Sequence, residues 1–286
     1  MKLGFIGTGV MGAAMASHLH ASENELFVYN RTKEKAQGLV DVGAIWCDDV
    51  KTVAQKADII FTIIGMPTDV EDVYLGEDGL IEHAKSGTVL IDMTTSQPEL
   101  AKRIYEAGLK RDIDCIDAPV SGGDVGARNG TLTIFLGGDE AVCVKMMPYF
   151  EMMGSHIAYL GGAGSGQHGK MVNQIAISGA VVGMVESLTY AKAAGLDLTI
   201  IQKAVSTGAA GSWQMSNMAP RVIAGNFDPG FFIKHYIKDM KIAVEEAKGN
   251  ELDLPVLELV LNQYKKLQEQ GLEDLGTQGL YKLYND

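Results

Sequence analysis

Six residues near the N-terminus, Gly7-Thr8-Gly9-Val10-Met11-Gly12, have the types and the spacing that bind phosphate through backbone amides. They follow a short apolar run, KLGFIG (2–7), and open a stretch with helical periodicity. In such a unit the first glycine permits a tight turn, the second lets backbone approach a pyrophosphate, and the third allows close helix–strand packing. The positive helix end then attracts the phosphates. The segment predicts a dinucleotide site, although an ordinary glycine-rich turn can carry the same pattern.

The end of the second apolar run, Tyr29-Asn30-Arg31-Thr32, bears on which dinucleotide binds. An NAD enzyme usually places an acid near this point, where it accepts from the ribose hydroxyls. Here Asn30 lacks a repelling charge, the planar guanidinium of Arg31 can pair with a 2′-phosphate, and Thr32 adds a hydroxyl. We therefore predict NADP, with NAD possible if Arg31 is merely solvated.

Lys170 and Asn173 stand three residues apart in a segment with helical periodicity, so they share one helix face. A lysine partly removed from water can exchange protons near neutral pH, which suits a catalytic acid or base. Gly164, Gly166 and Gly169 precede this pair, and we expect them to let substrate and backbone approach closely. The alternative for Lys170 is an ordinary surface lysine.

Ser121-Gly122-Gly123 follows the apolar run DCIDAPV (114–120). Parallel sheets bind ligands beyond the carboxyl ends of their strands. Two glycines after a serine leave amides bare, which predicts that this segment grips a carboxylate unless it is a simple loop.

The elements that must position these residues alternate between two kinds over the first 160 or so residues. Continuous apolar runs separated by helical stretches indicate a parallel sheet covered on both faces. The expected strands are 2–7, 25–30, 57–64, 88–93 and 114–120, with 131–138 and 155–161 as later strands of the same sheet.

After Gly166 the pattern becomes helical throughout. Residues from about 166 to 194 lack proline and predict one long helix, which Gly195 ends. The predicted fold is α/β: an N-terminal Rossmann-type doubly wound sheet, a long linking helix and an all-α C-terminal domain. The predicted parts are a dinucleotide-binding domain over 1–162, the interdomain helix over 163–194 and the helical domain over 195–286.

Composition narrows the partners of the 286-residue chain. Its formal net charge of −12 disfavours a nucleic-acid surface, because acidic surfaces repel phosphate backbones. The spacing of Cys47, Cys115 and Cys143 matches no zinc or redox pattern, so we expect buried thiols and no metal. Glycines and charges interrupt every long apolar run, and the N-terminus does not resemble a signal sequence. These features predict no membrane partner and a cytoplasmic location.

Four motifs in order resemble the β-hydroxyacid dehydrogenase family almost end to end. They are FIGTGVMG, DAPVSGGDVGARNGTL, GSGQHGKMVNQ and FFIKHYIKDMKIA. The family includes 3-hydroxyisobutyrate dehydrogenase, tartronate semialdehyde reductase and glyoxylate/succinic semialdehyde reductases. A more distant resemblance to 6-phosphogluconate dehydrogenase is disfavoured by that enzyme's much longer helical domain.

The resemblance implies hydride transfer with NADP(H) between a small β-hydroxyacid and its aldehyde acid. Lys170 matches the family's catalytic lysine, and Ser121-Gly122-Gly123 matches the segment that binds the substrate acid. Asn173 would hold the substrate hydroxyl or the lysine. Met66-Pro67 and Thr95 would lie beside the cofactor. Lys238, oriented by Asp239, would reach cofactor or substrate. The family commonly assembles through its helical domain, which implies a homodimer or homotetramer.

Several readings stay open at this point. The favoured substrates are tartronate semialdehyde and 3-hydroxyisobutyrate, with a glyoxylate/succinic semialdehyde reductase as the alternative. Gln174 replaces the asparagine of 3-hydroxyisobutyrate dehydrogenases and looks more like tartronate semialdehyde reductases. A non-catalytic nucleotide-binding protein is the alternative of another class. Lys170 disfavours it, as it also disfavours an imine reductase.

Overall fold

The computed structural model describes residues 1–21 and 24–285. It falls into two compact units, Met1–Lys170 and Met171–Asp286. The division runs through a long helix, so it does not test the predicted three-part boundaries, which stay a prediction.

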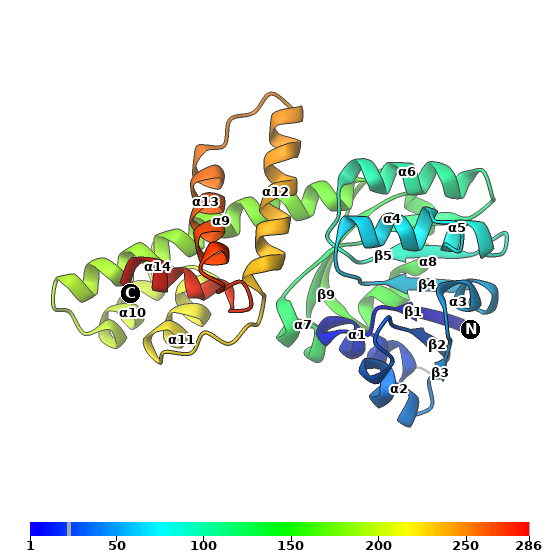
Figure 1. Ribbon diagram of the computed structural model, residues 1–286, viewed down its shortest axis with the longest axis horizontal. Coiled ribbons are helices and arrows are strands. Elements are labelled where there is room, and N and C mark those ends of the chain that lie inside the picture. Colours follow the sequence, from blue (N-terminus) through cyan, green and yellow to red (C-terminus); the bar gives the residue numbers. More distant parts are fainter. Residues whose placement is uncertain (22–23, 286) are drawn as a thin grey trace. The chain divides into compact units, whose positions relative to one another are not determined.

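Six parallel strands form most of the sheet in the first unit (Figure 1). They lie in the order β3-β2-β1-β4-β5-β6, so the chain runs outward from β1 and then returns to the other side of it. This doubly wound arrangement confirms the predicted fold class. The strands are β1 (Lys2–Ile6), β2 (Glu25–Tyr29), β3 (Ile45–Trp46), β4 (Ile59–Thr62), β5 (Val89–Asp92) and β6 (Asp114–Asp117). Only the two-residue β3 was too short to give a sequence pattern.

The last part of the sheet differs from the expected parallel continuation. The predicted strand 114–120 divides, because β6 ends at Asp117 and a separate β7 (Val120–Ser121) follows Pro119, which has no amide hydrogen to donate. β8 (Leu132–Gly137) pairs antiparallel with both β6 and β7. β9 (Gly154–Gly161) pairs parallel with β8. The chain reverses direction through the short helix α7 (Gly123–Asn129) and Gly130, whose φ of 65° suits glycine.

Alternate residues of the strands bury opposite faces. Leu3 and Phe5 belong to one apolar cluster, whereas Ile6 belongs to another with Ile60 and Leu90. Helices pack against the sheet (Figure 1), and their buried side chains complete the two clusters. They are α1 (Val10–His20), the 3₁₀ turn Lys33–Ala36, α2 (Gln37–Asp41), α3 (Val50–Lys56), α4 (Pro67–Leu75), α5 (Leu80–His83), α6 (Pro98–Leu109), α7 and α8 (Glu140–Glu151).

The predicted long helix is α9 (Ser165–Ala193). In the second unit its residues Val181, Met184, Val185 and Leu188 are buried in a helical core with α12 and α13. The other elements are α10 (Leu198–Ser206), a π-helical turn (Gln214–Met218), α11 (Ala219–Ile223), α12 (Ile233–Gly249), α13 (Pro255–Glu269), the 3₁₀ turn Thr277–Gly279 and α14 (Leu280–Asn285).

Within the described residues, α9 alone is long and apolar enough to cross a membrane by length and composition. This is weak evidence, because the core helix of a soluble protein passes the same test. The helix also carries buried Gln167, Lys170 and Gln174, whose polar groups are costly in hydrocarbon.

Candidate functional site

The glycine loop adopts the strand–turn–helix geometry that its sequence predicted. Gly7 has a φ of 96° and donates its amide to Tyr29 O at 2.9 Å. A Cβ on Gly12 would collide with the carbonyl oxygen of Gly7, so this glycine serves the packing of α1 on the loop.

Unlike Gly7 and Gly12, Gly9 is not required by contacts within the protein. Its φ of −71° and ψ of −167° suit any residue, and a Cβ there would meet nothing within 4 Å. The adjacent Thr8 hydroxyl is buried without a hydrogen-bond partner among the described residues. Val10 and Met11 begin α1, where backbone amides point outward unpaired. Open space, an orphaned hydroxyl and free amides fit a bound pyrophosphate.

After β2, Asn30 stabilises the glycine loop, whereas the Arg31 side chain faces outward. Asn30 accepts from Thr8 N at 2.9 Å through Oδ1 and donates to Thr32 O at 2.7 Å through Nδ2. Its amide therefore fixes the loop, which the sequence did not reveal. The Arg31 side chain is 85% exposed and only loosely paired with Asp69, at 3.4 Å, so a 2′-phosphate could engage it.

A buried carboxylate that the sequence reasoning missed organises the next two loops. Asp92 Oδ1, at the end of β5, accepts from Thr62 Oγ1 at 2.9 Å and from Thr94 N at 3.0 Å. Thr94 Oγ1 in turn accepts from Ile64 N at 3.0 Å. These bonds connect the loop that carries Met66-Pro67 to the loop that carries Thr95. An acid as the last residue of an apolar strand was the available signal.

Asp92 also predicts a pH dependence of stability. Burial raises its pKa to about 6, so the folded protein holds a proton that the unfolded chain loses from about pH 4. Stability should therefore fall as pH rises through this window, by roughly 2–3 kcal/mol at pH 7. Urea unfolding of Asp92→Asn and wild type at pH 4.5 and pH 7 should show the wild type losing stability relative to the variant. The exposed Asp72→Asn serves as control, and an unchanged difference for Asp92→Asn would contradict the prediction.

The start of α9 is held against the strand ends by a second buried acid. Asp117, the last residue of β6, accepts from Gly164 N at 2.8 Å and from Gln167 N at 2.9 Å. Burial raises the pKa of Asp117, although these backbone bonds oppose the shift. The Gln167 side chain bonds Ser96 N at 2.9 Å and Thr94 O at 2.8 Å. The Thr95 loop therefore lies at the first turns of α9.

Lys170 is one turn further along α9 and is only 6% exposed, so it is not a surface lysine. Its Nζ donates to Val120 O at 2.8 Å. Val120 immediately precedes Ser121, whose side chain is half-buried. The structure thus places the lysine beside the Ser121-Gly122-Gly123 segment, where Gly122 and Gly123 have φ angles of 126° and 63°.

The glycines before Lys170 serve packing rather than substrate approach, contrary to our expectation. A Cβ on Gly166 would collide with the carbonyl oxygens of Asp117 and Phe135, and one on Gly164 would meet Pro98 O at 2.9 Å. A Cβ on Gly169 would collide with Leu160. Gly166 and Gly169 are glycines because the start of α9 lies so close to the sheet, and Gly164 because it lies against α6.

In the second unit, the predicted site residues Asn173, Lys238 and Asp239 are joined by a series of hydrogen bonds and an ion pair, here called the polar chain. Asn173 Nδ2 donates to Gln174 Oε1 at 2.8 Å, and Gln174 Nε2 donates to Asp239 Oδ2 at 2.6 Å. Lys238 Nζ lies 3.2 Å from Asp239 Oδ1, and this ion pair is buried rather than exposed. Gln174 is the link that sequence reasoning did not assign a contact.

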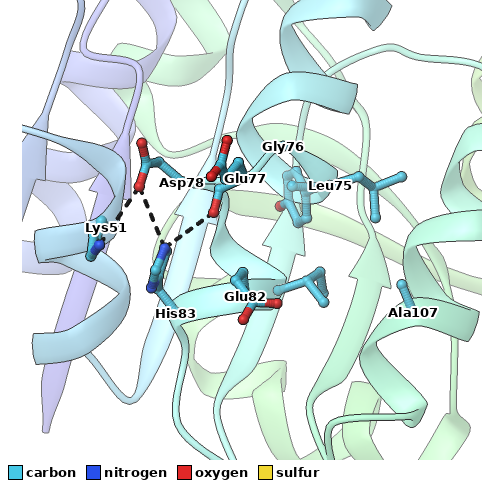
Figure 2. A pocket seen from close by; sticks show the side chains of 10 residues that line it. Lys51, Leu75, Gly76, Glu77, Asp78, Glu82, His83 and Ala107 are labelled. Carbon is cyan, nitrogen blue, oxygen red and sulfur yellow. Dashed lines mark hydrogen bonds and ion pairs between the residues drawn. The ribbon is translucent and has the colours of Figure 1, made fainter.

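A separate cavity of about 560 Å³ is lined by parts of α3, α4, α5 and α6 (Figure 2). None of the predicted site residues lines it. Asp78 lies 3.6 Å from both Lys51 Nζ and His83 Nε2, and His83 also bonds Glu77 O at 3.2 Å.

Two family models together match nearly the whole chain. Residues 2–161 match the NAD binding domain of 6-phosphogluconate dehydrogenase. Residues 164–284 match the model described as NAD-binding of NADP-dependent 3-hydroxyisobutyrate dehydrogenase.

Individual proteins agree with these models. An uncharacterized oxidoreductase of Bacillus subtilis, YkwC, is 52% identical over 282 residues, covering 99% of this chain and 98% of the relative. The 2-hydroxy-3-oxopropionate reductase of Escherichia coli is 38% identical over 255 residues, covering 89% and 87%. The structure of Psf3 in complex with NADP+ and 2-OPP is 26% identical, with a TM-score of 0.91, and covers 98% of this chain and 99% of that one.

A dinucleotide-binding sheet, a long helix with a buried lysine near its start and an all-helical unit define an NAD(P)-binding oxidoreductase that acts on a CH–OH group. The chain belongs to the β-hydroxyacid dehydrogenase family.

Proposed function

We propose that this protein interconverts a small β-hydroxyacid and its semialdehyde with NADP(H), using Lys170 as the acid and base. The observation that carries the proposal is the 2.8 Å bond from buried Lys170 Nζ to Val120 O, next to Ser121. It brings an amine that can move a proton beside a segment suited to a carboxylate. A β-hydroxyacid carries both groups that such a pair would recognise.

Each group of residues has one role in this proposal. Gly7 through Gly12, Arg31 and Thr32 would hold the dinucleotide phosphates and adenosine ribose, with Asn30 keeping the loop in shape. Met66, Pro67 and Thr95 would flank the ribose and nicotinamide. The bound cofactor supplies or accepts the hydride. Lys170 gives a proton to the oxygen of the reduced carbon and takes it back in the reverse direction. Ser121, Gly122 and Gly123 would bind the substrate carboxylate, with Asn173 and Lys238 at its other groups.

The favoured substrates are 2-hydroxy-3-oxopropionate (tartronate semialdehyde) and 3-hydroxyisobutyrate. The named activity of the Escherichia coli relative supports the first, and the model matched by residues 164–284 supports the second. Glyoxylate and succinic semialdehyde remain alternatives, because they also carry a carboxylate and a carbonyl. We further propose a cytoplasmic homodimer or homotetramer with no nucleic-acid partner.

The deciding experiment is a panel of these aldehyde acids and their hydroxyacids with NADPH and NADH, followed by nicotinamide absorbance. The expected result is turnover of at least one pair, fastest with tartronate semialdehyde or 3-hydroxyisobutyrate. Cofactor binding without turnover of any acid would favour a non-catalytic nucleotide-binding protein instead.

Arg31 should decide the preference for NADP. Arg31→Gln removes the guanidinium fork, and a lost charged hydrogen bond of about 1.5–3 kcal/mol should weaken NADP+ binding roughly 10- to 100-fold. NAD+ binding should change little, since NAD+ lacks the 2′-phosphate. Dissociation constants from calorimetry provide the measurement. The matched control is Arg103→Gln, another exposed arginine of the same unit. Equal losses for both cofactors would contradict the prediction, and a wild type preferring NAD+ would overturn the NADP assignment.

A further inference from the structure

The polar chain of the second unit has a direction that the residues themselves impose. A carboxylate only accepts hydrogen bonds, so Asp239 Oδ2 can pair with the Gln174 side chain only through its NH₂ group, as observed at 2.6 Å. The Gln174 carbonyl Oε1 then faces the other way and can only accept. It takes the donor from Asn173 Nδ2 at 2.8 Å.

This direction fixes which end of Asn173 is left for other partners. With Nδ2 engaged, the outward group is Oδ1, which makes no hydrogen bond to the part of the chain that the structure describes. Asn173 is half-buried, whereas Gln174 and Asp239 are 2% and 1% exposed. The two buried members therefore cannot exchange their bonds for water, and the amide of Asn173 cannot flip without leaving Gln174 Oε1 unpaired.

We propose that Gln174 is a positioning residue that, anchored by Asp239, turns Asn173 so that its carbonyl oxygen accepts from the hydroxyl of the substrate. This inference rests on the proposed function. It adds a preference, because an oriented acceptor pairs with the hydroxyl on the reacting carbon of a hydroxyacid but not with the aldehyde oxygen that replaces it, which only accepts.

Kinetics of Gln174→Met test the positioning role. The side chain keeps nearly the same length but loses both the donor and the acceptor. We expect KM for 3-hydroxyisobutyrate to rise about three- to tenfold, as for one lost neutral hydrogen bond, with a smaller change for its semialdehyde, which carries no hydroxyl. The dissociation constant of the cofactor and the pH profile of kcat should stay as in wild type.

A double-mutant cycle separates positioning from general damage. If Gln174 acts through Asn173, Gln174→Met should add no further rise in KM when Asn173 is already alanine. The matched control is Gln202→Met, which removes another buried glutamine whose Nε2 donates to Met215 O at 2.9 Å. It should leave KM unchanged. Independent, additive effects of the two site substitutions would overturn the proposal, as would a shifted kcat pH profile with unchanged KM.

A second measurement does not need turnover. The side-chain NH₂ signals of Gln174 and Asn173 in nuclear magnetic resonance spectra should shift in Asp239→Asn, because an amide at 239 no longer dictates the direction of the chain. The Gln202 signal should not move. If the Gln174 and Asn173 signals stay in place, the proposed positioning of Asn173 by Gln174 and Asp239 is wrong. If they shift while the wild type turns over no acid of the panel, the proposed function fails. The hydrogen bonds from Asp239 through Gln174 to Asn173 then orient these side chains without a role in substrate binding.

Discussion

Replacing Lys170 with alanine should lower kcat about 10²- to 10⁴-fold, equivalent to roughly 3–5 kcal/mol of transition-state stabilisation. The structure gives the reason, since this amine is buried and held 2.8 Å from Val120 O beside Ser121. Without it, the group that we propose as the donor of a proton to the oxygen that gains charge is missing. The loss should appear in kcat, measured with saturating cofactor and substrate, while the cofactor dissociation constant stays near that of wild type.

Two further lysine variants make this result specific. Lys170→Arg should not restore activity, because a guanidinium stays protonated and cannot act as a base. Lys192→Ala removes an exposed lysine from the last turn of the same helix and should leave kcat unchanged. A Lys170→Ala enzyme that keeps more than about a tenth of wild-type kcat would remove the acid/base role, since general acids contribute more than that. Lys238 would then be the next candidate.

Gly9→Ala should weaken dinucleotide binding roughly 10- to 100-fold, as expected when one charge-assisted hydrogen bond of about 1.5–3 kcal/mol is lost. The backbone at Gly9 is extended and its surroundings are open, so the protein itself tolerates a methyl group there. A pyrophosphate drawn against the loop would not, because the new Cβ would hold it away from the helix amides. Calorimetric titration with NADP+ gives the dissociation constant, and thermal unfolding should show an unchanged fold.

The contrast with other glycines sharpens this prediction. Gly38→Ala, at an exposed position of α2 with no neighbour within 4 Å of a Cβ, should leave affinity unchanged and raise stability by roughly 0.5–1 kcal/mol, because alanine is the better helix former. Gly12→Ala should instead lower stability, because its Cβ collides with the Gly7 carbonyl. Wild-type affinity in Gly9→Ala would mean that no phosphate approaches this loop.

The sequence by itself determined the features that depend on neighbours along the chain. Apolar runs alternating with helical stretches predicted the doubly wound sheet and the long helix α9, and both are confirmed. The family was recognisable from four ordered motifs, and it is confirmed by the matches over residues 2–161 and 164–284. The role of Gly12 could be understood early because its main constraint, the Gly7 carbonyl oxygen, lies within the same loop, whereas a Cβ on Gly7 would also collide with the distant Ile63 carbonyl oxygen.

Only the tertiary structure decided which contacts residues far apart in the sequence make. Gly164, Gly166 and Gly169 looked like a path for substrate, yet contacts with other parts of the first unit explain their lack of side chains. The reversal through α7 and Gly130 that sets β8 antiparallel to β6 and β7 also had no local signature, since strand direction depends on which partner the chain meets.

The same holds for the polar bonds of the candidate site. Lys170 meets Val120 across 50 residues of sequence, Gln167 meets Ser96 across 71 and Gln174 meets Asp239 across 65. Spacing along a helix says which residues share a face, but the partners of that face come from elements folded against it. A buried amide or carboxylate must find such a partner, because burying it unpaired costs about 1–3 kcal/mol or more. That requirement shapes the site, and it can be satisfied only after the chain has folded.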